Sequence, residues 1–271
     1  MNKNKSFWAV TTAIPIGCLG GLIGLGGAEF RLPVLVGLFK YSARQAVSLN
    51  LAVSLITVIS SLIFRLPQAP LQDLLAESPV ILALISGGIL GANAGAQYAK
   101  HLTERALEKV ILVLLVAIGC LLLIESVFAL NPHGLSMSIL TSIVVGIIMG
   151  TIIGAVSSLL GVAGGELIIP TLILIFGVDI KVAGTASLLI SLPTVMIGLL
   201  RHRKNGAFQK KEDLTQLVLP MGFGSIIGAL IGGMLMGAVS NSLLKLILGL
   251  ILIISACKMY LKVRKKEQHK K

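Results

Sequence analysis

Two short stretches of an otherwise apolar chain place ionisable side chains directly after closely spaced glycines. The first, GLGGAEFRLP, runs from Gly24 to Pro33 and carries Glu29 and Arg31. The second, GVAGGELIIP, runs from Gly161 to Pro170 and carries Glu166. An ionised acid at the centre of a membrane costs on the order of 3 kcal/mol, so each glutamate is expected to be protonated, paired or in contact with water. Such acids can exchange protons, and an arginine beside them can contact an anion.

The glycines predict breaks in the helices that contain them. Each glycine weakens a helix by about 1 kcal/mol relative to alanine and permits positive φ. A short helix that starts after the break, with the proline in its first turn, points free N–H groups and the positive end of its dipole into the protein, which favours anions. This interpretation assigns the following positions to a binding site: Gly24, Gly26, Gly27, Pro33, Gly161, Gly164, Gly165 and Pro170. Close helix packing is the alternative, and it accounts for scattered glycines such as Gly87 and Gly228.

The composition indicates an integral membrane protein. Of 271 residues, 55% are hydrophobic and 13% charged, and the mean hydropathy is +0.97. Soluble domains average about 25% charged residues. Apolar runs near the length of a membrane span are not alternating in period two, so they predict helices rather than barrel strands. These runs cover residues 8–27, 43–64, 78–99, 108–130, 137–160, 180–200, 214–238 and 241–257.

The chain contains an internal repeat. Residues 17–65 align with residues 154–202 without a gap, and the alignment pairs glycine, acid and proline positions in one register. Apolar composition alone does not produce such matches, so residues 1–130 and 131–271 are predicted to be two homologous transmembrane halves of one integrated membrane domain. Each half contains a ten-residue apolar stretch, 30–39 or 167–176, which is too short to span a bilayer by itself. Such a stretch fits a broken or re-entrant helix.

The distribution of basic residues favours one orientation. If the broken units cross and return, the halves are inverted, both termini are cytoplasmic, and only Arg65 and Lys181 among the loop cations lie outside. If the short stretches extend the first helices, the alternative is a parallel repeat of eight spans, with six cations outside. We therefore predict an all-α polytopic fold of inverted repeats, with a basic cytoplasmic tail after the second half.

The roles of the charged groups remain open between chemistry and structure. Glu29 and Glu166 are candidates for coupling transport to a proton gradient, or else acceptors that cap the short helices. Arg31 has no twin, because Ile168 occupies its place. It neutralises Glu29, contacts an anionic substrate, or extends to the membrane interface.

Hydroxyl and amide groups follow the short stretches at matched positions. Ser48 aligns with Thr185, and Asn50 aligns with Ser187. They could complete a shell around an anion, although polar side chains also hold membrane helices together.

The doubled pattern of a glycine cluster, four residues and Pro-x-Leu resembles the sulfite exporter TauE/SafE family of membrane anion permeases. The resemblance implies secondary transport of sulfite, sulfonates or related organosulfur anions across a prokaryotic inner membrane, with the glycine and proline positions above as the matched ones. The usual triple glycine is interrupted by Ala28 and Ala163, and Glu29 and Arg31 are added. These departures leave the substrate open.

We therefore predict a multi-pass permease for small anions in the cell membrane, possessing no cofactor and no metal site and binding no nucleic acid. The basic clusters at 201–211 and at the C-terminus are interpreted as cytoplasmic loops beside lipid. The alternatives are a passive anion channel or uniporter, an intramembrane enzyme, for which no catalytic motif is found, and a partner-binding subunit. Substrate, direction of flux, coupling ion and oligomeric state are left open, and a homo-oligomer is compatible with the sequence.

Overall fold

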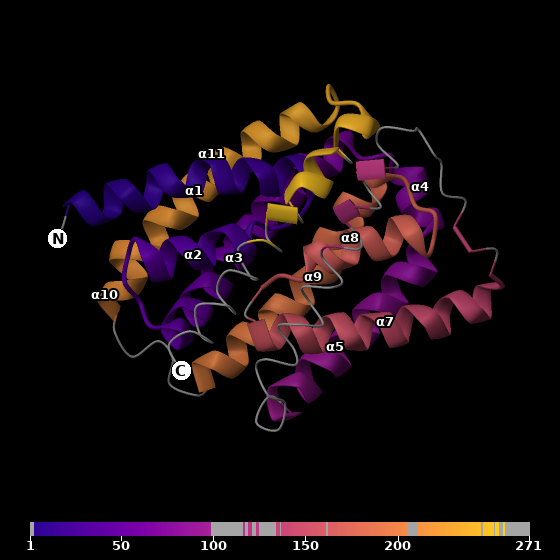
Figure 1. The fold of residues 1–271 in the computed structure, drawn as a ribbon, viewed down its shortest axis with the longest axis horizontal. Coiled ribbons are helices and arrows are strands. Elements are labelled where there is room, and N and C mark those ends of the chain that lie inside the picture. Colours follow the sequence, from indigo (N-terminus) through magenta and orange to yellow (C-terminus); the bar gives the residue numbers. More distant parts are fainter. Residues whose placement is uncertain are drawn as a thin grey trace.

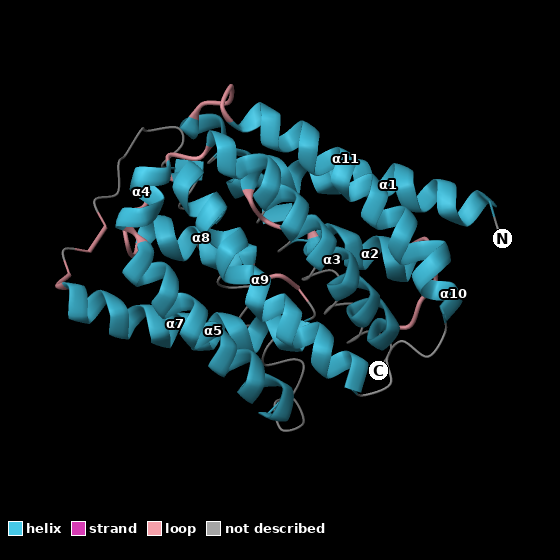
Figure 2. Ribbon diagram, turned by 180° about the vertical axis from the view of Figure 1, so that it is seen from behind, coloured by secondary structure: helices cyan, strands magenta, loops and turns pink. Residues whose placement is uncertain are grey.

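The computed structural model describes residues 3–98, 134–135, 137–160, 162–204, 211–244 and 246–251, with isolated positions at 116–124 and 253–257. Within this part of the chain the regular elements are helices, and no strand occurs (Figure 2). The run predicted at 108–130, the boundary at 130/131 and the basic tail lie largely or wholly outside the described residues.

Six long helical segments correspond to predicted apolar runs (Figure 1). Five described helices are long and apolar enough to cross a membrane. The helix from Ser78 is also apolar, but only its part Ser78–Ala94 counts toward a span, and this part is shorter than the other five. The chain is thus an all-helical protein with several candidate spans. The long helices are α1 (Lys3–Ile23), α3 (Ala43–Arg65), α5 (Ser78–Tyr98), α7 (Ile139–Leu160), α9 (Ile180–Lys204) and α11 (Leu219–Met236).

Short elements connect these helices. Two ten-residue helices, α2 (Ala28–Gly37) and α8 (Gly165–Leu174), each begin two residues before the predicted stretch. The remaining elements are η1 (Leu66–Gln68), α4 (Leu71–Ala76), α10 (Lys211–Asp213) and the π-helical turn η2 (Leu214–Val218).

Glycines pack α1 against α11 and α5 against α7. Cβ atoms on Gly224, Gly228 and Gly232 would overlap the backbone of Val10, Ile14 and Cys18, in that order, so α1 and α11 are parallel. Similarly, Gly87 and Gly91 of α5 lie against Ile147 and Thr151 of α7. These glycines let backbones approach closely, as the packing interpretation expected. Each pair joins a helix of the first half to a helix of the second, and the two pairs flank α3 and α9 (Figure 1).

The central helices α3 and α9 are antiparallel. Near the start of α3, Ser48 contacts His202 at the end of α9, whereas Arg65 at the end of α3 contacts Lys181 at the start of α9. We call the first end the Tyr41 end, because the α2–α3 loop with Tyr41 lies there beside Lys5 and Asp213. We call the other the Arg65 end, where η1 also meets the end of α11 through Gln68.

Each short helix turns back along the long helix before it. A Cβ on Gly27 would touch Ile16, and one on Gly164 would touch Ile153 and Ser157. Ile16 and Ile153 directly precede the two aligned ranges in the same register, so the two turns are built alike.

The prediction that the prolines lie in the first turn of the short helices was wrong. Pro33 and Pro170 are each the sixth residue of their helix, because α2 and α8 already start at Ala28 and Gly165. The glycine in the left-handed conformation directly before each helix starts it. A proline at this position removes the N–H that would bond to the carbonyl four residues earlier, which belongs to Glu29 in α2 and Glu166 in α8.

Candidate functional site

The first break depends on three glycines with positive φ. Gly24, Gly26 and Gly27 have φ of 95°, 76° and 69°. A side chain strains this left-handed conformation, so glycine is the residue that allows the turn. Gly27 is the N-cap of α2, with no side-chain cap. The N–H groups of the first turn of α2 are therefore left for other partners.

The second break also starts a short helix at a glycine with positive φ, and its described part contains one such glycine. Gly164 has φ 80° and is the N-cap of α8, again without a side-chain cap. Gly165 follows as the first residue of the helix. Gly161, which the sequence also assigns to the site, lies outside the described residues.

The two breaks lie against each other. A Cβ on Gly26 would be 3.2 Å from the Cβ of Ala163, which is its matched position in the second half. One on Gly165 would be 2.9 Å from the carbonyl oxygen of Leu25, and one on Gly24 would overlap the backbone of Gly184 in α9. The helix starts of both halves thus converge in the interior, with no room for side chains between their backbones.

Arg31 brings a guanidinium into this interior. Its side chain is 0% exposed, although it belongs to an apolar helix. Nη1 donates to Asn50 Oδ1 at 3.3 Å and to Ser54 Oγ at 3.0 Å, and Nη2 donates to Thr57 Oγ1 at 2.9 Å. The three acceptors are neutral and lie on one face of α3. Their dipoles solvate the guanidinium and fix its position against α3.

Asn50 and Ser187 connect the long central helices to the breaks. Asn50 Nδ2 donates to the carbonyl of Ala28 at 3.0 Å, while its Oδ1 accepts from Arg31. Ser187 Oγ, at the matched position, lies 2.5 Å from the carbonyl oxygen of Gly24. Both side chains therefore hold the backbone of the first break in place.

Ser48 and Thr185, the other matched pair, face the ends of the α3–α9 pair. Ser48 Oγ lies 3.1 Å from His202 Nδ1, and Thr185 Oγ1 accepts from Arg65 Nε at 3.3 Å. In the repeat register Arg65 aligns with His202, so these are the same contact in the two halves. The structure thus brings Asn50 and Ser187 to the breaks and directs Ser48 and Thr185 to basic side chains.

Both glutamates lie at the second residue of their helices. Acids in the first turn interact favourably with the helix dipole. Glu166 is partly buried. The hydrogen bonds of α8 begin beside it, because the N–H of Ile168 donates to the carbonyl of Gly164 at 2.9 Å. Glu29 occupies the equivalent backbone position in α2.

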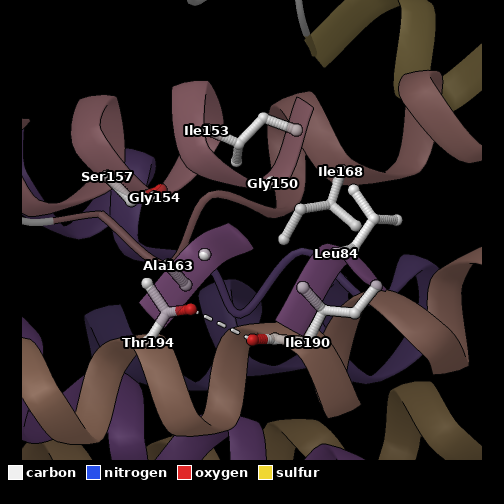
Figure 3. A pocket seen from close by; sticks show the side chains of 10 residues that line it. Leu84, Gly150, Ile153, Gly154, Ser157, Ala163, Ile168, Ile190 and Thr194 are labelled. Atoms are coloured by element: carbon white, nitrogen blue, oxygen red, sulfur yellow. Dashed lines mark hydrogen bonds between the residues drawn. The ribbon is translucent and has the colours of Figure 1, made fainter. Parts of the chain in front are cut away.

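A small cavity lies between α5, α7, α8 and α9 (Figure 3). The volume open to the centre of a water-sized molecule is about 10 Å³, which is room for roughly one such molecule. Leu84, Ile153, Ile168 and Ile190 supply apolar walls. The hydroxyl-bearing side chains in the lining are Ser157 of α7 and Thr194 of α9, which Figure 3 shows on opposite sides.

Comparison with known families settles the class of protein. The sequence matches the family described as Sulfite exporter TauE/SafE over residues 1–122 and 145–271. The chain belongs to this family. It is also 25% identical over 120 residues to the "Probable membrane transporter protein YunE" of Bacillus subtilis (strain 168), a match that covers 44% of this chain and 42% of that protein. No solved structure matches the chain.

Membership of the TauE/SafE family, together with several apolar helices, fits a multi-pass membrane protein. The names of the family and of the relative indicate transport rather than enzymatic catalysis. Among the described residues, no three His, Cys, Asp or Glu side chains gather as a metal site requires.

Four site features of this TauE/SafE chain escaped the sequence analysis. They are the buried Arg65, the contact of His202 with Ser48, the Arg31 partners Ser54 and Thr57, and the cavity hydroxyl of Ser157. The repeat register held part of the signal, because it aligns Arg65 with His202 and Thr57 with Thr194. Arg65, which the sequence placed in an external loop, is instead 0% exposed at the end of α3.

Proposed function

We propose that the chain is a secondary transporter that carries small anions, with sulfite and sulfonates as the first candidates, between the two glycine breaks. One observation carries this proposal: two matched helix starts converge on each other beside the buried guanidinium of Arg31. Helix N-termini and an arginine both favour oxyanions, and the arginine can bind two of their oxygens at once. The name of the family agrees with such a substrate.

The two halves are proposed to be inverted repeats. The antiparallel course of α3 and α9, which are matched helices, supports this arrangement. Transporters with such repeats bind substrate near the midplane, between discontinuous helices, and expose the site alternately by moving one repeat against the other. The turns at Gly27 and Gly164 supply discontinuous helices in both halves.

The Tyr41 end is proposed to face the cytoplasm. Lys5, Lys40 and the basic residues of 201–204 lie toward this end, whereas Lys181 and the buried Arg65 lie at the other. An excess of basic residues marks cytoplasmic loops. The start of α1 would then be cytoplasmic, whereas the predicted cytoplasmic C-terminus lies outside the described residues.

Proton coupling is assigned to Glu29 and Glu166. Both sit at the helix starts where the substrate is proposed to bind, so that protonation of an acid there would change the local charge felt by an anion. Glu29→Gln and Glu166→Gln are expected to abolish accumulation driven by a pH gradient while the protein still folds. Unchanged coupling in both variants would contradict the assignment and leave the acids with a role in the helix dipole.

The proposed function is tested by flux of sulfite, sulfate and methanesulfonate into liposomes that contain the purified protein, with and without a pH gradient. Saturable uptake that follows the gradient is expected. Arg31→Gln should lower uptake about ten- to hundredfold, the value of one or two charged hydrogen bonds. Gly37→Ala is the matched control in α2, because a Cβ there meets no atom within 4 Å.

Each other outcome of this assay points to a different class. Flux that ignores the pH gradient indicates a channel or uniporter. An absence of flux for every anion, with a folded protein, would overturn the assignment of the glycine breaks to anion transport.

A further inference from the structure

The cavity occupies the place in the second half where Arg31 and its partners sit in the first. Ile168 matches Arg31, and Thr194 matches Thr57, the acceptor of Arg31 Nη2. Both Ile168 and Thr194 line the cavity. In the first half the guanidinium fills the space between α2 and α3, whereas the shorter isoleucine leaves space between α8 and α9.

Ser157 marks the cavity as polar at one point. Its side chain is 2% exposed, and within the described residues its Oγ has no hydrogen-bond partner. A buried hydroxyl without a partner costs free energy, so such a group indicates a ligand or a water molecule. The remaining walls are mostly apolar. The space that they enclose admits about one non-hydrogen atom.

The cavity adjoins the contact between the two breaks. Ala163 lines the cavity and also faces Gly26. The same Cβ on Gly26 would also be 3.2 Å from Val58, the neighbour of Thr57, which accepts from Arg31. The partners of the guanidinium and the cavity thus both adjoin the place where the breaks meet.

We propose that this cavity is a subsite for a hydroxyl group on the substrate, and that Ser157 is its hydrogen-bonding partner. The inference rests on the proposed transport of anions. When the two repeats move against each other and the breaks separate, the charged group of the substrate is held toward Arg31, and a short carbon chain places a hydroxyl in the cavity of the second half. The site is therefore selective for small hydroxylated organic anions over their deoxy analogues, because a deoxy analogue leaves Ser157 unsatisfied.

The test compares 2-hydroxyethanesulfonate with ethanesulfonate as competitors of labelled sulfite uptake in liposomes. The wild-type protein is expected to bind the hydroxylated anion about tenfold more tightly, as one hydrogen bond to a buried group allows. Ser157→Ala should remove this preference, so that 2-hydroxyethanesulfonate competes no better than ethanesulfonate. A preference that is absent in the wild type, or that survives in Ser157→Ala, would overturn the inference. The Ser157 hydroxyl would then bind a structural water molecule.

Gly88→Ala provides a second variant that fills the cavity. Its Cβ would lie 3.1 Å from Thr194 Oγ1, a side-chain atom that can shift slightly, so folding is expected to persist. The variant should weaken 2-hydroxyethanesulfonate selectively, whereas Gly198→Ala on α9, where a Cβ makes an ordinary 3.6 Å contact with Leu51, should change neither anion. Equal weakening of both sulfonates and sulfite would overturn the subsite. Failure of the proposed function itself is distinguishable, since it would abolish sulfite uptake in the wild type.

Discussion

A contact between a hydroxyl and a basic side chain occurs at both ends of the α3–α9 pair, but the two contacts differ in strength. At the Arg65 end, the guanidinium donates to Thr185 and to three carbonyl oxygens, those of Gly21, Leu22 and Lys181, at 2.7–3.3 Å. At the Tyr41 end, His202 at the matched position meets Ser48 at 3.1 Å. Arg65 is 0% exposed, whereas His202 is partly exposed.

This difference shows how a duplicated scaffold becomes asymmetric. One arginine links the ends of α1 and α3 to the start of α9, so separating these helices would break several charged hydrogen bonds at once. Among the described residues, separation at the Tyr41 end breaks the Ser48–His202 hydrogen bond, which involves no guanidinium, so the structure is expected to open at the Tyr41 end at lower cost. The Lys5, Tyr41 and Asp213 group lies at that same end, outside the α3–α9 crossing.

Arg65→Gln is expected to have the largest effect. It removes a buried charge that satisfies helix-end carbonyls, and the loss should lower the free energy of unfolding by about 3 kcal/mol or more. Thermal unfolding of the detergent-solubilised protein measures this loss. Arg203→Gln, an exposed arginine near the opposite end, is the control and should leave the melting temperature unchanged. Equal melting temperatures for Arg65→Gln and the wild type would refute a strong closure at the Arg65 end.

Tyr41→Phe should have an intermediate effect. The hydroxyl accepts from Lys5 Nζ at 2.8 Å and donates to Asp213 Oδ1 at 2.5 Å, so the variant loses both bonds between α1, the α2–α3 loop and α10. We expect a loss of about 1–2 kcal/mol, because the group is only partly buried. The same unfolding assay checks this value, and a loss as large as that of Arg65→Gln would remove the contrast between the ends.

Ser48→Ala and Thr185→Val compare the matched hydroxyls directly. Each removes one neutral side-chain partner, and we expect losses of about 1 kcal/mol. Combining each variant with His202→Ala or Arg65→Gln gives two double-mutant cycles. The coupling energy should be larger for Thr185 with Arg65, because one partner is charged. A larger coupling for Ser48 with His202 would reverse the order of the two ends.

Alkaline pH should weaken the Tyr41 end through the tyrosine. Burial, followed by the hydrogen bond to Asp213, raises the pKa of Tyr41 above its usual value near 10. Since the folded-state pKa is the higher one, the stabilisation is fully present below pH 10 and is lost as the pH rises through the folded-state value. Absorbance of the tyrosinate should therefore appear at higher pH for Tyr41 than for a free tyrosine, and Tyr41→Phe should lack this step at high pH. Titration of every tyrosine at its usual pH would contradict the expected shift.

The sequence predicted local structure better than helix partners. Glycine and proline act within a few residues, so the positions of α2 and α8 were predicted to within two residues of the observed starts. The first-turn placement of Pro33 and Pro170 was wrong because left-handed glycines already start the helices. The burial of Arg65 depends on α1 and α9, which are distant in sequence, and no periodicity within α3 reveals that contact.

The candidate site was predicted in part for the same reason. The repeat register identified both breaks and the aligned polar positions. It could not show that Asn50 would orient toward Arg31, or that replacing Arg31 by Ile168 would leave a cavity, because both depend on the space between packed helices. Whether the converging breaks carry substrate stays a prediction.

The parallel pairs α1–α11 and α5–α7 have a consequence for biosynthesis. Each pair takes one helix from the segment made early and one from the segment made late, and their glycines leave no alternative but close backbone contact. As the ribosome releases the chain, α1 and α5 enter the bilayer before their partners exist. Their exposed glycine grooves must then be covered by lipid or by an insertion factor until α7 and α11 arrive. Assembly is therefore completed only late in translation, and a product truncated after the first half would retain two unfilled grooves by which quality control could recognise it.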